Sequence, residues 1–183
     1  MTMPDGRWNA WYDGGITAMQ PFGNSSTYEI GARFLSNCRV VEDWGCGLGW
    51  FRGYCRHGYV GIDGSHTPHA DVYADLRHYR SDVDGIFMRH VLEHNHEWQR
   101  ILDNAMHSFR DSMVVILFTP LALVTHQIGG TMIDDVEIPD YSFRLDDLTD
   151  RTESEGITAS WMVNLPSPDT QYGVEHVLLL ERR

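Results

Sequence analysis

The sequence predicts an α/β fold, a three-layer sandwich in which helices cover both faces of an open and mostly parallel sheet. Three observations lead to this prediction. Short β-rich runs alternate with helical periods from residue 38 onwards. The run SMVVILF (112–118) is apolar throughout, as is typical of a central strand that is covered on both sides. The last two predicted strands are joined by LPSPDTQYG, which is too short for a crossover helix, so they should pair antiparallel.

Seven strands are predicted, at residues 39–43, 59–63, 71–75, 84–89, 112–118, 157–164 and 174–182. The clearest helix should follow Asn95 as its N-cap, because apolar residues within 98–109 recur at helical spacing. Two more helices are predicted, at 48–58 with Gly58 as its C-cap, and at 145–156. Only seven residues separate the second and third strands, so we expect a very short or irregular crossover there.

Composition and charge restrict the function. Acidic residues outnumber basic residues 26 to 14, and nucleic-acid binding needs a basic face, so we expect no nucleic-acid partner. All 14 basic residues are arginine, which excludes a catalytic lysine. The three cysteines (Cys38, Cys46 and Cys55) contain no Cys-x-x-Cys pair, and with no signal peptide they predict a reducing cytoplasm and no structural zinc. The longest apolar run, 113–118, is too short to span a bilayer, so we expect no membrane partner.

The stretch VVEDWGCGLGWF (40–51) places three glycines between a predicted strand and a predicted helix. Glycine lets the chain turn sharply and lets a ligand approach the backbone. A dinucleotide-binding loop would have its last glycine one position after Gly49. Asp43, at the end of the strand, would repel a phosphate and attract an ammonium group. Considered alone, the glycines are also consistent with a tight turn that binds nothing.

Two further acids end the next two predicted strands. Asp63 follows Gly45 by 18 residues, and an acid at this place can accept two hydrogen bonds from a ribose diol. Asp75 lies 12 residues later, again at the carboxyl edge where open α/β sheets bind their ligands. A single aspartate at a strand end is more often a solvated turn residue. Three at successive strand ends, beside a glycine loop, predict a ligand site.

With these motifs the chain resembles the class I S-adenosylmethionine-dependent methyltransferases, which have a Rossmann-like fold. VVEDWGCGLG resembles the family's first motif, YVGIDGS its ribose motif, YADLRHY its adenine-reading segment and DGIFMRHVLEH its fourth-strand motif. The resemblance covers roughly residues 38 to 118, and the order of the last elements extends it to 183. It implies S-adenosyl-L-methionine as the cofactor, methyl transfer to an oxygen or nitrogen of a small-molecule acceptor, and a mostly parallel seven-stranded sheet with an antiparallel last strand.

The resemblance also implies which residues contact the cofactor, namely Asp43, Gly45, Cys46, Gly47, Gly49, Asp63, Gly64, Asp75, Leu76 and Arg89. The glycine loop would approach the methionine portion, Asp63 would hold the ribose, and Asp75 with the Leu76 amide would read the adenine. The chain departs from the family in two respects. The shortened crossover should leave the adenine pocket more open, and Trp44 is bulky where the family often has a small residue.

The histidines provide the candidates for a general base, which is needed only if the acceptor must lose a proton. His90 is the first candidate, because imidazole titrates near neutrality, and His126 is the second. A capping or packing role for His90 stays open. His90 and His94 have the spacing of two metal ligands on a helix, but the pattern His-Glu-x-x-His is absent, so we expect no metal site.

We expect a single domain over 1–183, with a cofactor-binding half at 38–118. An N-terminal lid or helix (1–37) and a lid loop (119–145) should flank the acceptor, followed by a C-terminal helix and β-hairpin (146–183). Trp8, Trp11 and Tyr12 form either a core staple or an aromatic cover for the sulfonium. Two other functions stay open: a non-catalytic cofactor-binding regulatory or scaffold subunit, and a nicotinamide-dependent oxidoreductase, which the glycine spacing disfavours. The oligomeric state is not predicted.

Overall fold

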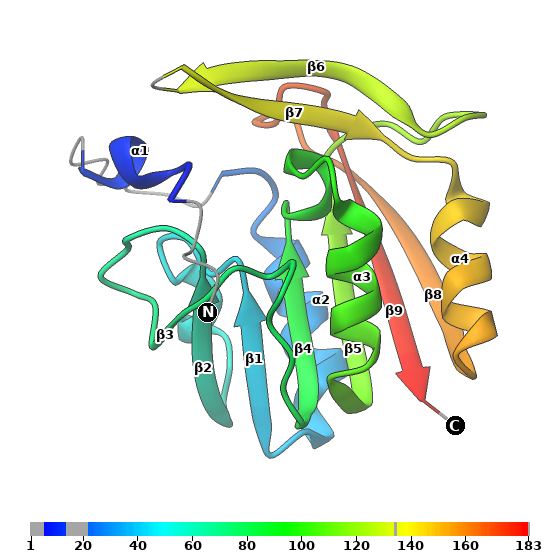
Figure 1. The fold of residues 1–183 in the computed structure, drawn as a ribbon. Coiled ribbons are helices and arrows are strands. Elements are labelled where there is room, and N and C mark those ends of the chain that lie inside the picture. Colours follow the sequence, from blue (N-terminus) through cyan, green and yellow to red (C-terminus); the bar gives the residue numbers. More distant parts are fainter. Residues whose placement is uncertain (1–5, 14–21, 134, 183) are drawn as a thin grey trace.

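The computed structural model describes residues 6–13, 22–133 and 135–182, and its main feature is a seven-stranded sheet (Figure 1). The strand order is β3-β2-β1-β4-β5-β9-β8. In chain order the strands are β1 (Val40–Trp44), β2 (Gly58–Asp63), β3 (Val72–Tyr73), β4 (Val83–Arg89), β5 (Phe109–Leu117), β8 (Ile157–Pro166) and β9 (Val174–Arg182). β1 to β5 pair in parallel, whereas β9 is antiparallel to both β5 and β8. The predicted mostly parallel sheet with an antiparallel last strand is confirmed.

Helices lie on both faces of this sheet, which confirms the three-layer sandwich (Figure 1). α2 (Ser26–Phe34) and the 3₁₀ turns η1 (Leu35–Asn37) and η2 (Trp50–Gly53) contribute to one core, in which Phe51 and Phe87 stack with their centroids 3.7 Å apart. α3 (Trp98–Met106) and α4 (Leu145–Ser154) contribute to the core of the opposite face. The sheet is therefore buried on both sides, which explains its apolar central strand.

α3 has the predicted apolar face but not the predicted ends. Trp98, Ile101 and the other apolar residues at this spacing are buried. The prediction that Asn95 is the N-cap is wrong. Its side-chain amide donates to the Val91 carbonyl (2.6 Å), and the residue before the helix is Glu97. Phe109 begins β5 instead of ending the helix.

The crossovers on the β3 side of the sheet are short. The helix predicted at 48–58 is reduced to the one turn of η2, and Gly58 opens β2. Three glycines with positive φ precede this turn, and glycine is a poor helix former. Residues 64–71 contain no helix, as expected for the short second crossover.

Residues 119–145 were predicted to be a loop, and this is wrong in part. They contain β6 (His126–Ile133) and β7 (Val136–Ser142), an antiparallel hairpin above the carboxyl edge of the sheet (Figure 1). Gly130 does not break the pairing. It lies opposite Pro139, where a Cβ atom would come within 2.8 Å of the Ile138 carbonyl oxygen, so glycine permits a close approach of the strands.

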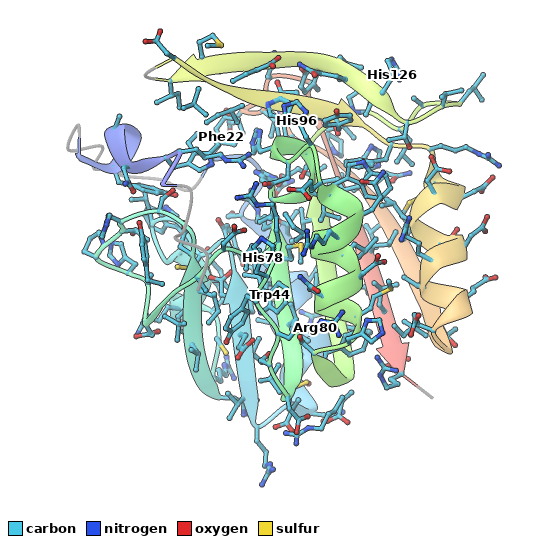
Figure 2. The ribbon with its side chains drawn as sticks, in the orientation of Figure 1. Phe22, Trp44, His78, Arg80, His96 and His126 are labelled. Carbon is cyan, nitrogen blue, oxygen red and sulfur yellow. The ribbon has the colours of Figure 1, made fainter. Side chains whose placement is uncertain are left out.

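Trp44, the unusual residue of the glycine motif, faces the protein core. Its side chain is fully buried in the core on the α3 side, and Nε1 donates to Oε2 of Glu42 (2.8 Å) (Figure 2). Glu42 also accepts hydrogen bonds from Tyr79 and Ser81. The bulky residue is thus explained by packing and by a satisfied buried carboxylate.

Candidate functional site

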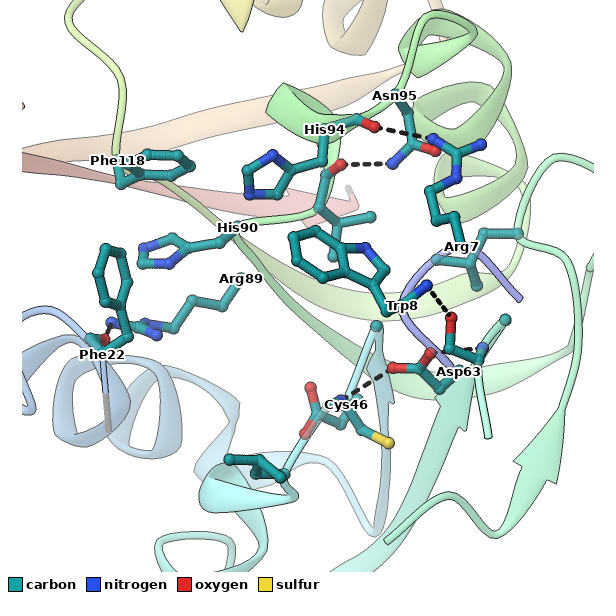
Figure 3. Close-up of a pocket in the computed structure, with 18 of the residues that line it drawn as sticks. Arg7, Trp8, Phe22, Cys46, Asp63, Arg89, His90, His94, Asn95 and Phe118 are labelled. Carbon is teal, nitrogen blue, oxygen red and sulfur yellow. Dashed lines mark hydrogen bonds between the residues drawn. The ribbon is translucent and has the colours of Figure 1, made fainter. Parts of the chain in front are cut away.

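A cavity of about 570 Å³ lies at the carboxyl ends of β1, β2 and β4 (Figure 3). Its walls come from the glycine loop, the turn after β2, the end of β4, the N-terminal segment and the β6–β7 hairpin. Of the ten residues predicted to contact the cofactor, all line this cavity except Gly49. His90 lines it too. The structure therefore brings together residues from four sequence motifs.

The glycine loop needs its glycines for two different reasons. Gly45, Gly47 and Gly49 all have positive φ, at 75°, 50° and 68°. A Cβ atom on Gly45 would lie 2.4 Å from Cγ2 of Val91, so this glycine lets the loop pack closely below the cavity. A Cβ atom on Gly49 would instead meet His69, which places the third glycine outside the cavity wall.

Asp63 joins the glycine loop to the end of β2. Its Oδ2 accepts a hydrogen bond from the Gly47 amide (2.9 Å), and its Oδ1 accepts one from the Ser65 amide (2.8 Å). The residue is 5% exposed and lines the cavity. A carboxylate can accept about four hydrogen bonds, which is the capacity that binding a diol requires.

Asp43 is a buried acid at the end of β1. Its Oδ2 accepts the hydroxyl of Tyr59 (2.8 Å). Burial raises the pKa of Asp43 to about 7, the charge of Asp63 adds to this rise, and the Tyr59 hydrogen bond opposes it. A cationic group in the cavity would stabilise the ionised form of both carboxylates, so these two acids fit a ligand that carries ammonium and sulfonium charges.

The predicted adenine end contains Asp75 and Leu76, both at the cavity wall. Asp75 is paired with Arg77, whose Nη2 lies 2.8 Å from Oδ2 and whose backbone amide donates to Oδ1 (2.9 Å). Burial favours a higher pKa for Asp75, but the hydrogen bonds from Arg77 outweigh it and hold the pKa below its usual value. This carboxylate is therefore ionised and fixed in place.

His90 adopts a left-handed conformation, with φ at 57°, directly after β4. This orientation brings Nε2 within 2.7 Å of Oε1 of Glu175, a fully buried residue near the start of β9. Burial lowers the pKa of His90 to about 3, the Arg89 charge acts in the same direction, and Glu175 opposes both. The imidazole is thus neutral near pH 7. Because a carboxylate only accepts hydrogen bonds, Nε2 carries the hydrogen and Nδ1 has the lone pair.

Arg89 lines the cavity, but its guanidinium is largely engaged by the protein. It donates to Glu175 (2.7 Å), to the Tyr28 hydroxyl (3.0 Å), to Thr27 (3.2 Å) and to the Phe22 carbonyl. These bonds tie the end of β4 to the segment that leads into α2. Arg89 thus supports the site by fixing Glu175 and the wall beside His90.

The N-terminal segment covers part of the cavity. Its short helix α1 (Asn9–Asp13) is preceded by Trp8, whose amide donates to the Ser65 hydroxyl (3.0 Å) and whose ring meets the His94 ring edge-on at 5.3 Å. Figure 3 shows Trp8 between Asp63 on one side and His94 on the other. Trp8 and Tyr12 line the cavity, which supports the aromatic-cover interpretation. The side chain of Trp11, residues 1–5 and residues 14–21 lie outside the described part.

The second candidate base, His126, is not at the cavity. It lies exposed at the start of β6, where Nδ1 is 2.8 Å from the Val124 carbonyl oxygen (Figure 2). The described residues contain no group of three His, Cys, Asp or Glu side chains that could hold a metal ion. Within the same residues, no helix has the length and apolar character needed to cross a membrane.

Several cavity residues were not predicted from the sequence. Asp140, Phe22 and Phe118 line the cavity near His90 and His94, and Glu175 contributes through its hydrogen bond with His90. Glu175 could have been suspected, because it lies just before the apolar run VLLL (177–180), and an acid that is buried with such a run must have a partner. Asp140 carried no such signal, since its hairpin was not recognised.

The strand order, the antiparallel β9 and a cavity at the carboxyl edge define the fold of the class I S-adenosylmethionine-dependent methyltransferases. Solved structures of such enzymes share it. The 1,6-didemethyltoxoflavin-N1-methyltransferase of Burkholderia thailandensis, solved with 1,6-didemethyltoxoflavin and S-adenosylhomocysteine, has a TM-score of 0.73 and 15% identity, over 95% of this chain and 84% of that one.

Two other structures show the same likeness. Magnesium protoporphyrin IX methyltransferase from Synechocystis, with bound S-adenosylhomocysteine, has a TM-score of 0.66 and 15% identity, over 86% of this chain and 83% of its own. The mitomycin 7-O-methyltransferase has a TM-score of 0.56 and 14% identity, over 98% of this chain and 69% of its own. No family model matches the chain, and no curated protein matches its sequence. At these identities the comparisons show the fold.

Proposed function

We propose that the protein is an S-adenosyl-L-methionine-dependent methyltransferase that acts on a small-molecule acceptor. The observation that carries this proposal is the joint placement of a glycine loop, the buried acids Asp43 and Asp63, and a neutral imidazole at His90 around one cavity. The solved relatives in fold with S-adenosylhomocysteine bound give further support.

The cavity residues have the chemistry that the cofactor needs. The loop amides and Asp43 would hold the methionine end, where the ammonium group favours an ionised carboxylate. Asp63 would accept the ribose hydroxyls. Asp75, held in its ionised form by Arg77, would accept a hydrogen bond from the adenine amino group, with Leu76 beside it.

When bound, the cofactor would supply an electrophilic methyl group on a sulfonium, whose sulfur would keep the bonding pair as a neutral thioether. His90 would take up the proton of the acceptor at Nδ1. Its hydrogen bond to Glu175 would keep a hydrogen on Nε2, so that Nδ1 has the lone pair. A weakly basic imidazole is sufficient for this role, because an oxygen or nitrogen that gains a methyl cation becomes strongly acidic. The walls position the acceptor for displacement.

Calorimetry with S-adenosylhomocysteine tests cofactor binding. Asp63→Asn should weaken binding about 10- to 100-fold, the loss of roughly 1.5–3 kcal/mol for a charge-assisted hydrogen bond. Asp82→Asn, at an exposed aspartate far from the cavity wall, is the matched control and should leave the affinity unchanged. Equal affinities of the Asp63 variant and the wild type would remove this assignment. Tighter binding of NAD than of S-adenosylhomocysteine would favour the oxidoreductase alternative.

Methyl transfer itself is tested with labelled cofactor and a broad panel of small acceptors. His90→Gln retains a donor for Glu175 but lacks Nδ1, so it should lower turnover far more than it lowers cofactor affinity. Turnover equal to that of the wild type would exclude the base role. Tight S-adenosylhomocysteine binding without transfer to any acceptor would favour the regulatory or scaffold alternative.

We further propose a cytoplasmic location and a single domain over residues 1–183. Three free cysteines support a reducing compartment, and the net charge of -12 supports a small-molecule acceptor over a nucleic acid. In this proposal the N-terminal segment and the β6–β7 hairpin are the two walls around the acceptor, since residues of both line the cavity.

A further inference from the structure

The acceptor end of the cavity contains a second imidazole–carboxylate pair besides His90 and Glu175. Nδ1 of His94 lies 3.2 Å from Oδ1 of Asp140 and 3.0 Å from the carbonyl oxygen of Pro139. Asp140 is buried on β7, and the Tyr172 hydroxyl donates to its other oxygen (3.0 Å). The hairpin therefore fixes one imidazole, and β9 fixes the other.

In each imidazole one nitrogen is held by the protein and the other is available to a ligand. Carboxylate and carbonyl oxygens only accept hydrogen bonds, so Nε2 of His90 and Nδ1 of His94 carry hydrogens. An imidazole with one hydrogen on the held nitrogen can accept a hydrogen bond at the other one, which is Nδ1 in His90 and Nε2 in His94. Both side chains line the cavity, and no hydrogen bond from another described residue reaches either of these two nitrogens.

Aromatic rings surround the two imidazoles (Figure 3). Phe118 contacts both, with centroid distances of 4.9 Å to His90 and 5.2 Å to His94. Phe22 meets His90 and Phe118 edge-on at 5.9 and 6.1 Å, and Trp8 meets His94 at 5.3 Å. Walls of this kind favour a flat apolar ligand, which buries its faces and edges against them.

The charge pattern disfavours an acceptor that presents an anionic group to this wall. Two arginines line the cavity, and both are engaged by the protein: Arg7 donates to the His94 carbonyl (2.9 Å). Arg89 donates to Glu175, Tyr28, Thr27 and the Phe22 carbonyl. The carboxylates of Glu175 and Asp140 would repel a further anion near the two imidazoles.

We propose that the acceptor is a neutral, planar aromatic or heteroaromatic molecule with two hydrogen-bond donors, one for Nδ1 of His90 and one for Nε2 of His94. This inference rests on the proposed methyl transfer, because it assigns the acceptor of that same site. A ring with two hydroxyls, or with one hydroxyl and one ring N–H, satisfies both nitrogens. A ring with a single donor leaves one of them unpaired in a cavity from which the ligand has displaced water.

The first test compares three ligands of one shape. 2,3-Dihydroxynaphthalene, 2-naphthol and 2,3-dimethoxynaphthalene are titrated calorimetrically into protein saturated with S-adenosylhomocysteine, so that no turnover occurs. The diol should bind about tenfold or more tightly than 2-naphthol, which corresponds to one additional hydrogen bond, and the dimethoxy compound should bind most weakly. Equal affinity of the diol and 2-naphthol, preference for the dimethoxy compound, or no binding of any of the three would overturn the proposal.

The second test removes one lone pair at a time. His94→Asn keeps an amide donor for Asp140 but lacks Nε2, and His90→Gln keeps a donor for Glu175 but lacks Nδ1. Each should reduce the preference for the diol over 2-naphthol to about onefold, with unchanged affinity for S-adenosylhomocysteine. A variant that keeps the wild-type preference would overturn the role of that histidine and with it the proposal.

His96→Asn is the matched control. His96 is two residues from His94 but lines a separate surface depression, so its variant should keep the preference (Figure 2). If a variant no longer binds S-adenosylhomocysteine, the comparison of the three naphthalenes with the wild-type protein tests the proposal instead. Failure of the wild type to bind S-adenosylhomocysteine would overturn the proposed function, whereas normal binding without preference for the diol overturns only the acceptor assignment.

Discussion

Glu93 should become a source of instability as the pH rises, and Glu93→Gln should remove that instability. The side chain is fully buried in η3 (Leu92–His94), where Oε1 accepts the Phe118 amide (2.6 Å) and Oε2 has no hydrogen-bond partner among the described residues. Burial raises the pKa of Glu93 from 4.5 to about 7. A folded-state pKa above the unfolded value means that the neutral acid is favoured by folding. Its contribution is complete below about pH 4.5 and is lost as the pH rises through about 7.

The magnitude follows from the two pKa values. The interval from 4.5 to about 7, at about 1.4 kcal/mol per pH unit, gives roughly 3 kcal/mol of lost stability at alkaline pH. Glutamine has the shape of the protonated acid and does not titrate, so the variant avoids this loss. Its advantage over the wild type in the free energy of unfolding should widen by about 2 kcal/mol between pH 5 and pH 8.

Urea unfolding of both proteins at a series of pH values measures this difference. Asp43, with a folded-state pKa of about 7, and His90, whose unfolded imidazole has a pKa of 6.5, also contribute in this range, but their contributions are common to both proteins and cancel in the comparison. A difference that is the same at pH 5 and pH 8 would refute the reasoning, as would a variant less stable than the wild type at pH 8. Either result would mean that Glu93 is ionised in the folded protein at little cost.

Two further predictions concern the glycine motif. Gly45→Ala should lower the free energy of unfolding by at least 1–3 kcal/mol and abolish S-adenosylhomocysteine binding, because φ is 75° and Cβ would clash with Val91. Gly53→Ala, where the added carbon meets nothing within 4 Å, serves as its control in the same unfolding and binding assays, and similar losses in both variants would contradict the steric argument. Trp44→Phe should cost about 1–3 kcal/mol of stability, since it leaves Glu42 with one donor fewer, yet it should not change the affinity for S-adenosylhomocysteine; a large change in affinity would place Trp44 at the cofactor.

Structural features that depend on residues close together in the sequence were predicted well. Strand positions followed from apolar runs bounded by turn residues, and the antiparallel last strand followed from the short linker before it. The proposed cofactor end was also predictable, because Asp43 and Asp63 lie at the ends of β1 and β2, and Asp75 lies two residues after β3. In a parallel sheet those ends share one edge, so sequence position alone brings such residues together.

The proposed acceptor end depends on contacts that local patterns do not encode. In the β6–β7 hairpin, β6 buries no residue and β7 buries three in a row (138–140), so neither strand shows the alternation of buried and exposed residues by which a strand is recognised. The pairing of His90 with Glu175 joins residues 85 positions apart, and it depends on a left-handed backbone conformation that a histidine seldom adopts. His126 was favoured because it is a histidine in the segment 119–145, and the hairpin holds it away from the cavity.

The antiparallel direction of β9 has a consequence for the order of assembly. Its first residues, including Glu175, arrive at the edge where the parallel strands end, and β8 joins the sheet only through β9. During synthesis, β1 to β5 leave the ribosome first, so the chain can form the cofactor end before β9 exists. The carboxylate partner of His90 is then supplied by the last strand to be synthesised. A chain that stops before Val174 would keep the glycine loop and the three strand-end acids but lack the carboxylate behind the base and the connection to β8.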